Sequence, residues 1–342
     1  MDRRLAGRQR HSLAAAAFAA ALAALAPASA GASAFADPLD TPAAKSRLAA
    51  TGLYNGLARA GSRIVAVGQR GHIVYSDDTG ISWQQAKVPV SSDLVAVTFP
   101  TPAYGWAVGH DGVVLHTSDG GASWTSQLDG RALGKLLGNA NKRLAEQGAE
   151  NPFLDVWFAN QRSGFVVGAF NLILHTEDGG RTWQPWLDRT DNKTDLHLYA
   201  IRAVAGHLFI AGEQGLLMRL DPVSARFRTV EVPYKGTFFG LAGDKDSVVA
   251  FGLRGNAFRS SDAGKTWEPM ATGVQVGLTA GSSHEGRLVL VSQAGHILSS
   301  RDGAAFRPVK VERATPAAAV IGAGPSTVVV AGPRGLRTQR LD

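Results

Sequence analysis

A short motif recurs along the chain and constrains its fold more than any other feature. It has the form Ser/Thr-x-Asp-x-Gly-x-Ser/Thr-Trp, which we call the Asp box, and it follows two apolar segments joined by a tight turn. Four copies are complete, and three more near residues 220–227, 300–306 and 341–342 are incomplete. A repeated unit decides the architecture before any local pattern does. The complete boxes contain Asp78, Gly80 and Trp83; Asp119, Gly121 and Trp124; Asp178, Gly180 and Trp183; and Asp262, Gly264 and Trp267.

The residue before each tight turn gives an independent measure of the repeat. Successive positions are separated by 41, 59, 44, 40, 40 and 40 residues. Each unit reads as four short apolar segments, which in the second unit are residues 94–100, 105–110, 113–117 and 124–128. Four-stranded antiparallel blades at this period are typical of a β-propeller. We therefore predict an all-β, seven-bladed propeller. The positions used are Gly68, Gly109, Gly168, Gly212, Gly252, Ser292 and Gly332.

The last unit predicts how the ring closes. It supplies only three strands, near residues 319–323, 327–331 and 336–340. Residues 37–50 are the one segment outside the export signal that has no strand assigned, so we predict that they add the fourth strand of the seventh blade. Such closure would remove a free strand edge that otherwise invites aggregation.

The step of 59 residues contains an insertion, residues 129–151, between the second and third blades. Its leucines recur at helical spacing, while its basic residues lie largely off that face. We expect one inserted helix of about 15 residues here. The residues on the apolar face are Leu133, Leu136, Leu137, Ala140 and Leu144.

Residues 1–36 have the pattern of an export signal. Four arginines precede an apolar stretch at residues 13–25, which is too short to span a bilayer comfortably. Small residues at Ala34 and Ala36 offer a cleavage site before Asp37, and Ala28 to Ala30 offer a competing one. We expect cleavage near Ala36 and a periplasmic or otherwise exported protein of residues 37–342.

Composition narrows the classes of partner. Removing residues 1–36 takes away four arginines and one aspartate, which lowers the formal charge from +7 to +4. That charge is too small and dispersed to predict nucleic-acid binding. The sequence has no cysteine, so packing alone must close the fold. No histidines share a metal-ligand spacing and no glycine-rich phosphate loop precedes a helix, so we expect no cofactor, metal or small-molecule substrate. We expect the propeller to be a monomer.

Folding accounts for every residue type of the Asp box. The aspartate can accept backbone N–H groups, the glycine can take a positive φ, and the tryptophan can be buried between blades. We interpret the boxes as structural, and Trp106 and Trp157 as packing residues. His116 and His175 occupy equivalent third-strand positions where other units carry varied residues, so we expect both on a solvated strand face.

Strand direction predicts which face of the ring binds a partner. Strands alternate in direction within a blade, so the connections between blades share a face with the turns between second and third strands, opposite the Asp boxes. Those turns carry Arg70, Arg254 and Arg334, and the second unit carries His110 there. We predict that these four residues bind a partner.

Two stretches resemble a known family. Residues 94–99 and 104–109 leading to Trp124, and residues 154–158 and 164–168 leading to Trp183, are similar to the repeat of the photosystem II assembly and stability factors, which are exported seven-bladed Asp-box (BNR-repeat) propellers. The resemblance covers essentially all of residues 37–342. It implies a non-catalytic scaffold that docks on a membrane-protein assembly through an arginine-bearing face. For a heterotrophic relative it suggests a companion of an envelope exporter of the resistance-nodulation-division type.

Two other classes remain as alternatives. Asp boxes also occur in sialidases and other glycoside hydrolases, but sialidases use a six-bladed ring and an Arg-Ile-Pro motif that this chain lacks. Asp155 and Glu213 are the inward carboxylates that a different hydrolase could use, because such enzymes need a pair of carboxyl groups. A carbohydrate-binding propeller without catalysis is the second alternative.

Overall fold

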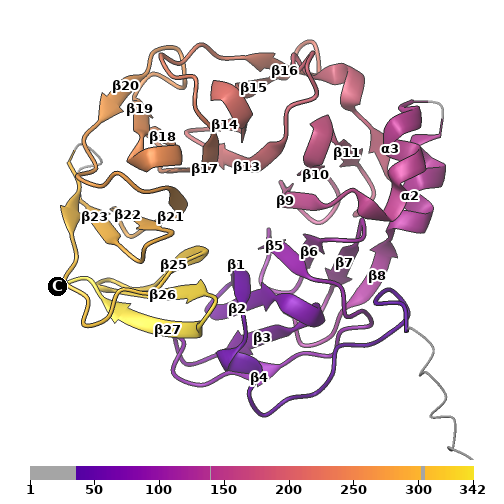
Figure 1. The fold of residues 1–342 in the computed structure, drawn as a ribbon, viewed down its shortest axis with the longest axis horizontal. Helices are drawn as coiled ribbons and strands as arrows, with labels where there is room; N and C mark the ends of the chain where they lie inside the picture. Colours follow the sequence, from indigo (N-terminus) through magenta and orange to yellow (C-terminus); the bar gives the residue numbers. More distant parts are fainter. Residues whose placement is uncertain (1–35, 139, 302–304) are drawn as a thin grey trace, which may run out of the picture. The chain divides into compact units, whose positions relative to one another are not determined.

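Seven antiparallel sheets make up residues 37–342 in the computed structural model, which describes residues 36–138, 140–301 and 305–342 (Figure 1). The chain divides between Ala36 and Asp37, so the predicted export signal lies almost wholly outside the described residues. Each inner strand contacts the inner strand of the next blade, and β25 contacts β1, so the ring is closed. The prediction of a seven-bladed all-β propeller is confirmed.

Six sheets have four strands and the last has three. The first four blades contain β1 (Tyr54–Ala60), β2 (Arg63–Gly68), β3 (Ile73–Ser76) and β4 (Gln84–Gln85); β5 (Leu94–Thr98), β6 (Gly105–Gly109), β7 (Val114–Thr117) and β8 (Thr125–Leu128); β9 (Phe153–Phe158), β10 (Gly164–Gly168), β11 (Ile173–Thr176) and β12 (Gln184–Pro185); and β13 (Leu198–Val204), β14 (His207–Gly212), β15 (Leu217–Asp221) and β16 (Arg226–Thr229). The other three contain β17 (Phe238–Gly243), β18 (Val248–Gly252), β19 (Ala257–Ser260) and β20 (Glu268–Met270); β21 (Leu278–His284), β22 (Arg287–Ser292), β23 (Ile297–Ser300) and β24 (Arg307–Pro308); and β25 (Ala319–Gly324), β26 (Thr327–Gly332) and β27 (Gly335–Arg340).

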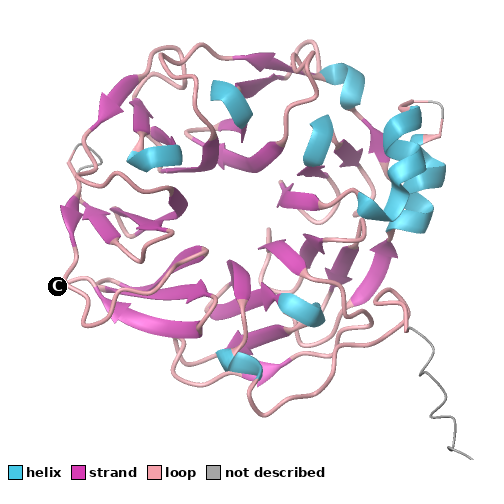
Figure 2. Ribbon diagram, viewed as in Figure 1, coloured by secondary structure: helices cyan, strands magenta, loops and turns pink. Residues whose placement is uncertain are grey.

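The second strand of each blade forms the core. Strands β6, β10, β18 and β22 are buried along their whole length, because neighbouring blades cover both faces of each sheet. This explains why they read in the sequence as short continuous apolar runs. Helical turns are confined to the connections, as Figure 2 shows. They are η1 (Ala49–Thr51), η2 (Gln69–Gly71), η3 (Gly148–Glu150), η4 (Ala169–Asn171), η5 (Leu187–Arg189), η6 (Glu213–Gly215) and η7 (Leu253–Gly255).

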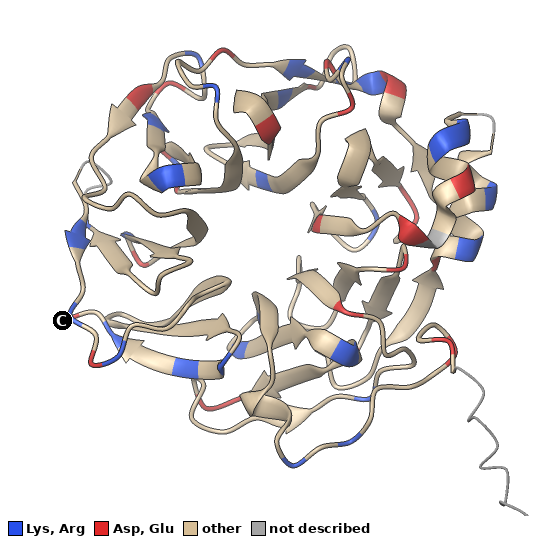
Figure 3. Ribbon diagram, viewed as in Figure 1, with Lys and Arg blue, Asp and Glu red and all other residues tan. Residues whose placement is uncertain are grey.

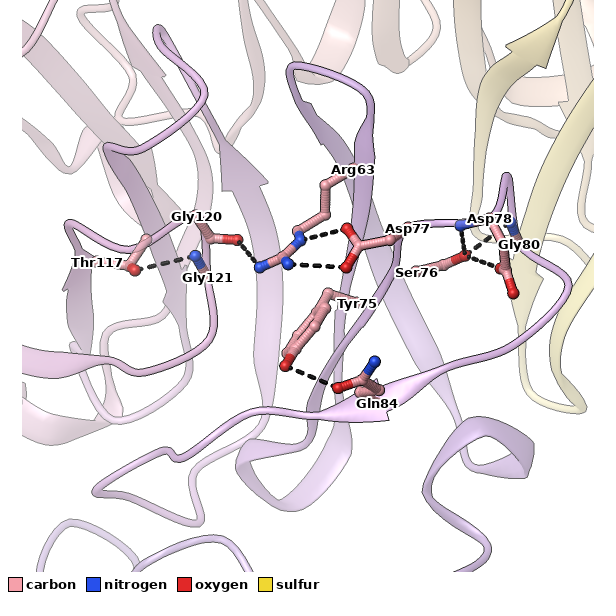
Figure 4. A network of polar contacts seen from close by, with 10 residues as sticks. All are labelled: Arg63, Tyr75, Ser76, Asp77, Asp78, Gly80, Gln84, Thr117, Gly120 and Gly121. Carbon is pink, nitrogen blue, oxygen red and sulfur yellow. Dashed lines mark hydrogen bonds and ion pairs between the residues drawn. The ribbon is translucent and has the colours of Figure 1, made fainter.

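The Asp box uses its carboxylate inside its own turn. In the first blade, Asp78 Oδ1 accepts a hydrogen bond from Ser76 Oγ at 2.7 Å (Figure 4) and another from Ser82 N at 2.9 Å. The Ser82 hydroxyl donates to Asp78 Oδ2, and this bond, together with the two to Oδ1, lowers the pKa of Asp78 to about 2. Gly80 takes a φ of 92°, which a side chain would strain.

Arg63 ties the first blade to the second. Its Nε and Nη2 bind the two carboxylate oxygens of Asp77 at 2.7 and 2.8 Å, and its Nη1 donates to the Gly120 carbonyl of the next Asp box at 3.2 Å (Figure 4). The guanidinium also lies 4.1 Å from the centroid of the Tyr75 ring. One side chain therefore joins two neighbouring sheets at the Asp-box face.

The predicted closing strand is wrong. The seventh blade keeps three strands, and residues 37–50 form no strand. This segment runs along the first blade instead, where Ala43 N donates to Val88 O at 3.1 Å and Ser91 N donates to Pro38 O at 2.8 Å. Prolines lack the N–H that a strand ladder needs, and Leu39 and Ala43 pack against the core of the first two blades.

The insertion forms two helices rather than the single one expected. Helix α2 (Gly130–Leu137) begins at Asp129, whose side chain accepts from Ala132 N, and ends at Gly138 with a φ of 37°. Helix α3 (Lys142–Gln147) begins with its own cap, Asn141. Gly138 ends the first helix and Asn141 begins the second. These local capping signals outweigh the continuous apolar pattern that predicted a single helix. No helix among the described residues is long and apolar enough to cross a membrane.

Candidate functional site

The turns between second and third strands lie on one face of the ring, together with the connections between blades. We call it the turn face, formed by residues 69–71, 110–112, 169–171, 213–215, 253–255, 293–295 and 333–335. Antiparallel order puts the insertion on this face and the Asp boxes on the other. The turn face therefore contains all four residues that the sequence predicted for partner binding.

Arg70 and Arg254 occupy the corners of their turns. Arg70 has a φ of 53° and precedes Gly71 at 69°, while Arg254 has a φ of 57° and precedes Gly255 at 76°. Two successive positive φ values suit the twist of the flanking strands. A Cβ on Gly71 would approach Val90 O to 2.0 Å, so the turn is pressed against the next connection. Both arginine side chains are exposed.

Asp93 links Arg70 and His110. Its carboxylate accepts a hydrogen bond from Arg70 N at 2.7 Å, and its carbonyl accepts one from His110 N at 2.9 Å. The two predicted residues therefore flank the same connection between the first and second blades. An exposed carboxylate lies between them, so the positive charge on this side of the ring is partly balanced.

Arg254 lies beside Tyr234, an aromatic residue in the connection between the fourth and fifth blades. The Tyr234 hydroxyl donates to Leu253 O at 3.1 Å. Burial raises the pKa of this phenol, while a hydrogen bond with Asn256 and the charge of Arg254 oppose the rise. A cation and a half-buried ring thus adjoin at this corner of the turn face.

Arg334 lies in the exposed turn between β26 and β27. The next residue, Gly335, has a φ of 88°. Helical turn η1 packs against it so closely that a Cβ on Gly335 would lie 2.6 Å from Ala50 O. In the described part of the chain, the side chains of Arg70, Arg254 and Arg334 make no hydrogen bond or ion pair with one another or with other residues. Figure 3 shows basic and acidic residues interspersed around the ring rather than gathered in one patch.

The sequence reasoning missed a cluster where the insertion meets the ring. The Arg143 guanidinium of α3 lies 4.6 Å from the centroid of the Phe170 ring and 3.7 Å from Asp195. Phe170 N donates to His197 Nδ1 at 2.8 Å. Phe170 is partly buried and has the same turn position as Arg70, so an aromatic residue where another repeat has arginine was the available signal. The cluster extends the turn face over the third blade.

Asp155 and Glu213 do not come together. Asp155 lines the central channel and pairs with Arg202. Glu213 lies in η6, where its Oε2 accepts from His197 N at 2.9 Å. Asp155 is the one carboxylate among the described residues that line the channel cavity. These two residues therefore do not supply the facing carboxyl groups that glycoside hydrolysis needs.

Trp106 of the second strand β6 is a packing residue, and the histidines of the third strands β7 and β11 are at least partly buried. Trp106 is fully buried and stacks on Phe158 with centroids 3.6 Å apart. The expected solvated position is wrong for His175, which is buried with its ring 4.3 Å from that of Phe165. Burial lowers the pKa of His175, because the charged form would lose its hydration. His116 is half-buried, and burial lowers its pKa as well.

Known proteins with the same architecture support the sequence resemblance. The solved structure titled "YCF48 bound to D1 peptide" has a TM-score of 0.66 at 17% identity, covering 86% of this chain and 94% of that one. The structure of YCF48 from Cyanidioschyzon merolae has a TM-score of 0.61 at 16% identity, covering 85% and 96%. At these identities the likeness concerns the fold.

Sequence comparison identifies the family. The photosystem II assembly lipoprotein Ycf48 of Synechococcus sp. (strain CC9902) is 28% identical over 126 residues, which are 36% of this chain and 37% of that protein, so the chain spans well under half of this relative. The profile described as "Photosynthesis system II assembly factor YCF48" matches residues 75–134 and 139–305, more than half of the chain. The chain therefore belongs to the YCF48 family of photosystem II assembly factors.

Proposed function

We propose that the protein is a non-catalytic accessory factor that docks on a membrane protein complex and assists its assembly. Family membership supports this proposal. The family takes its description from the photosystem II assembly factor YCF48, and one solved YCF48 structure has a D1 peptide bound. The observation that carries the proposal is the set of exposed arginines without ion-pair partners among the described residues, Arg70, Arg254 and Arg334, on one face of the ring.

The partner surface on this proposal is acidic. A guanidinium binds a carboxylate through two parallel hydrogen bonds, so each arginine can hold one acidic side chain or a chain end. Because the three residues stand on separate turns, the partner contacts them at separate points around the channel mouth. His110 lies next to Arg70 and adds a ring donor to the same part of the face.

The proposed location is the periplasm, after cleavage near Ala36, and the proposed working form is a monomer. The identity of the complex follows from the host. In a photosynthetic host it is photosystem II, and in a heterotroph it is an envelope exporter of the resistance-nodulation-division type. The chain carries no feature of its own that requires photosynthesis.

A crosslinking capture tests the proposal. The tagged protein is recovered from crosslinked, detergent-solubilised envelopes beside a variant with Arg70→Glu, Arg254→Glu and Arg334→Glu. A control with Arg181→Glu, Lys245→Glu and Lys265→Glu makes the same change of net charge on the Asp-box face. We expect one membrane complex to be enriched by the native and control proteins and lost with the turn-face variant.

The capture also identifies what would overturn the proposal. Equal recovery of the complex by both variants would remove the turn face from docking, and loss with the control alone would move docking to the other face. Recovery of cell-wall glycan in place of protein would favour the carbohydrate-binding alternative. Recovery should weaken as the salt concentration before crosslinking rises. The Debye length, about 10 Å at 0.1 M salt, shortens with added salt, so the attraction between exposed charges becomes weaker.

A further inference from the structure

The central channel contains a cavity that docking on the turn face does not explain. Its volume is about 380 Å³, and the inner strands of all seven blades line it. Small-molecule sites span about 300 to 1,000 Å³, so the cavity is large enough for a small ligand. Its walls carry both apolar and polar side chains.

A repeated bulge shapes one level of the cavity. In the first six blades the inner strand shifts register after its first residue, so its second residue has no partner in the adjacent strand. Every one of these unpaired residues lines the cavity. Two of them form an aromatic wall, with the rings of Tyr199 and Phe239 edge to face at 5.6 Å. The six are Asn55, Val95, Leu154, Tyr199, Phe239 and Thr279.

The third blade departs from the other six at the next residue. The equivalent positions elsewhere are glycine or alanine, whereas the third blade has Asp155. Its side chain is only 4% exposed. Asp155 Oδ2 accepts from Ile201 N at 2.8 Å and from Arg202 Nη1, but Oδ1 accepts no hydrogen bond from any described residue. Asp155 lines the cavity, so Oδ1 is left to accept from a donor in the channel, either water or a ligand hydroxyl. The equivalent residues are Gly56, Ala96, Ala200, Gly240, Ala280 and Ala319.

Arg202 offers the complementary groups beside it. Its Nη1 binds Asp155 and donates to Ile201 O at 2.7 Å, while its Nε and Nη2 donate to no described residue. The Arg202 side chain is 45% exposed and lines the cavity. Asp155 and Arg202 are the two charged residues among the described lining, so the wall is neutral as a whole yet presents an acceptor and donors side by side.

We infer that the channel binds a neutral monosaccharide or disaccharide. Adjacent sugar hydroxyls each donate and accept, so one hydroxyl can donate to Asp155 Oδ1 while its neighbour accepts from Arg202. The apolar face of the sugar ring lies against Tyr199 and Phe239. A charged ligand is disfavoured because Arg202 already neutralises Asp155, and a small amide would leave most of the cavity unfilled. This site is independent of docking, since it lies in the channel and not on the turns.

Calorimetry and saturation-transfer NMR on the purified full chain test the inference. The probes are glucose, N-acetylglucosamine, maltose and trehalose, with glucuronate and acetamide as comparison ligands. We expect saturable binding of at least one neutral sugar. Arg202→Gln should weaken it about tenfold, the effect of losing one hydrogen bond to a charged group. Arg181→Gln, on the Asp-box face, should leave it unchanged.

A second variant keeps the test decisive if Arg202→Gln does not fold. Tyr199→Ala removes half of the aromatic wall without touching the ion pair, and it should weaken sugar binding while the melting curve stays cooperative. The inference is overturned by any of three results: no saturable binding at the highest soluble sugar concentration, glucuronate or acetamide binding as tightly as the best sugar, or both channel variants binding like the native protein. The envelope capture with turn-face variants decides docking separately.

Discussion

The guanidinium of Arg131 in helix α2 lies 2.7 Å from the carboxylate of Asp37 and 2.8 Å from that of Asp40. These contacts fasten the segment before the first blade to an insertion about 90 residues further along the chain. Backbone hydrogen bonds hold the same segment along the first blade, and Arg131 adds a second attachment, to the insertion.

Replacing Arg131 should free this segment without unfolding the propeller. Arg131→Gln removes both ion pairs, but all three side chains are exposed, and exposed pairs contribute little to global stability. We expect faster proteolysis and faster amide exchange in residues 37–46, with almost no change in melting temperature. Lys135→Gln, on the same helix, is the control. A large fall in melting temperature would show that the segment is part of the cooperative core.

The Asp boxes predict how stability depends on pH. The pKa of Asp78 is lowered to about 2. Burial raises the pKa values of Asp119 and Asp178, but hydrogen bonds from the box outweigh it, and such bonds lower the pKa of Asp262 as well. A carboxyl group whose pKa is lower in the folded state stabilises it above its unfolded pKa, and that stabilisation is lost as pH falls through the folded value. Urea midpoints should therefore fall steeply from about pH 4 towards pH 2. Asp78→Asn should flatten that dependence, whereas Asp246→Asn should not.

Arg63 predicts a modest, measurable coupling within the first blade, between β2 and the Asp-box turn. Its bidentate pair with Asp77 is partly exposed, with side-chain exposures of 23% and 54%. Solvent screening therefore limits the pair to about 0.5 to 1 kcal/mol. A double-mutant cycle with Arg63→Gln and Asp77→Asn, read from urea unfolding, measures this coupling. A larger loss in the Arg63 single variant is expected, because that variant also loses the bond to Gly120 O and the contact with Tyr75. Additive single effects would contradict the pairing.

The repeat made the ring predictable, but the contacts that complete it were not. Period and turn glycines report local geometry, so the blades could be counted from the sequence. The contact between Arg131 and Asp37 joins residues far apart in sequence, and no local pattern carries that information. The break at Gly138 was visible as a stop signal, yet the apolar period of the insertion concealed it. The burial of His175 was missed because its column varies between blades.

The candidate site was predictable to a similar degree. Strand alternation placed Arg70, Arg254 and Arg334 on one face, because that argument needs only the order of strands. The ion pair of Asp155 with Arg202 depends on two inner strands of neighbouring blades meeting at the channel, which is tertiary information. Asp155 stood out only by its charge at a position where the other repeats have glycine or alanine, and alignment of the repeats was the signal that could have revealed its role.

Gly71 in the turn face should tolerate a side chain far less well than Gly206, which lies in the turn between β13 and β14. A Cβ on Gly71 would lie 2.0 Å from Val90 O, whereas one on Gly206 would meet nothing within 4 Å, although both residues have positive φ values of 69° and 77°. Gly206→Ala therefore isolates backbone strain, which costs about 1 to 2 kcal/mol. Gly71→Ala adds a clash with backbone that cannot move without separating two blades, so its free energy of unfolding should fall by more than about 3 kcal/mol. Equal losses for the two variants in urea unfolding would show that the connection at Val90 yields, and that the position of Arg70 is not rigidly held.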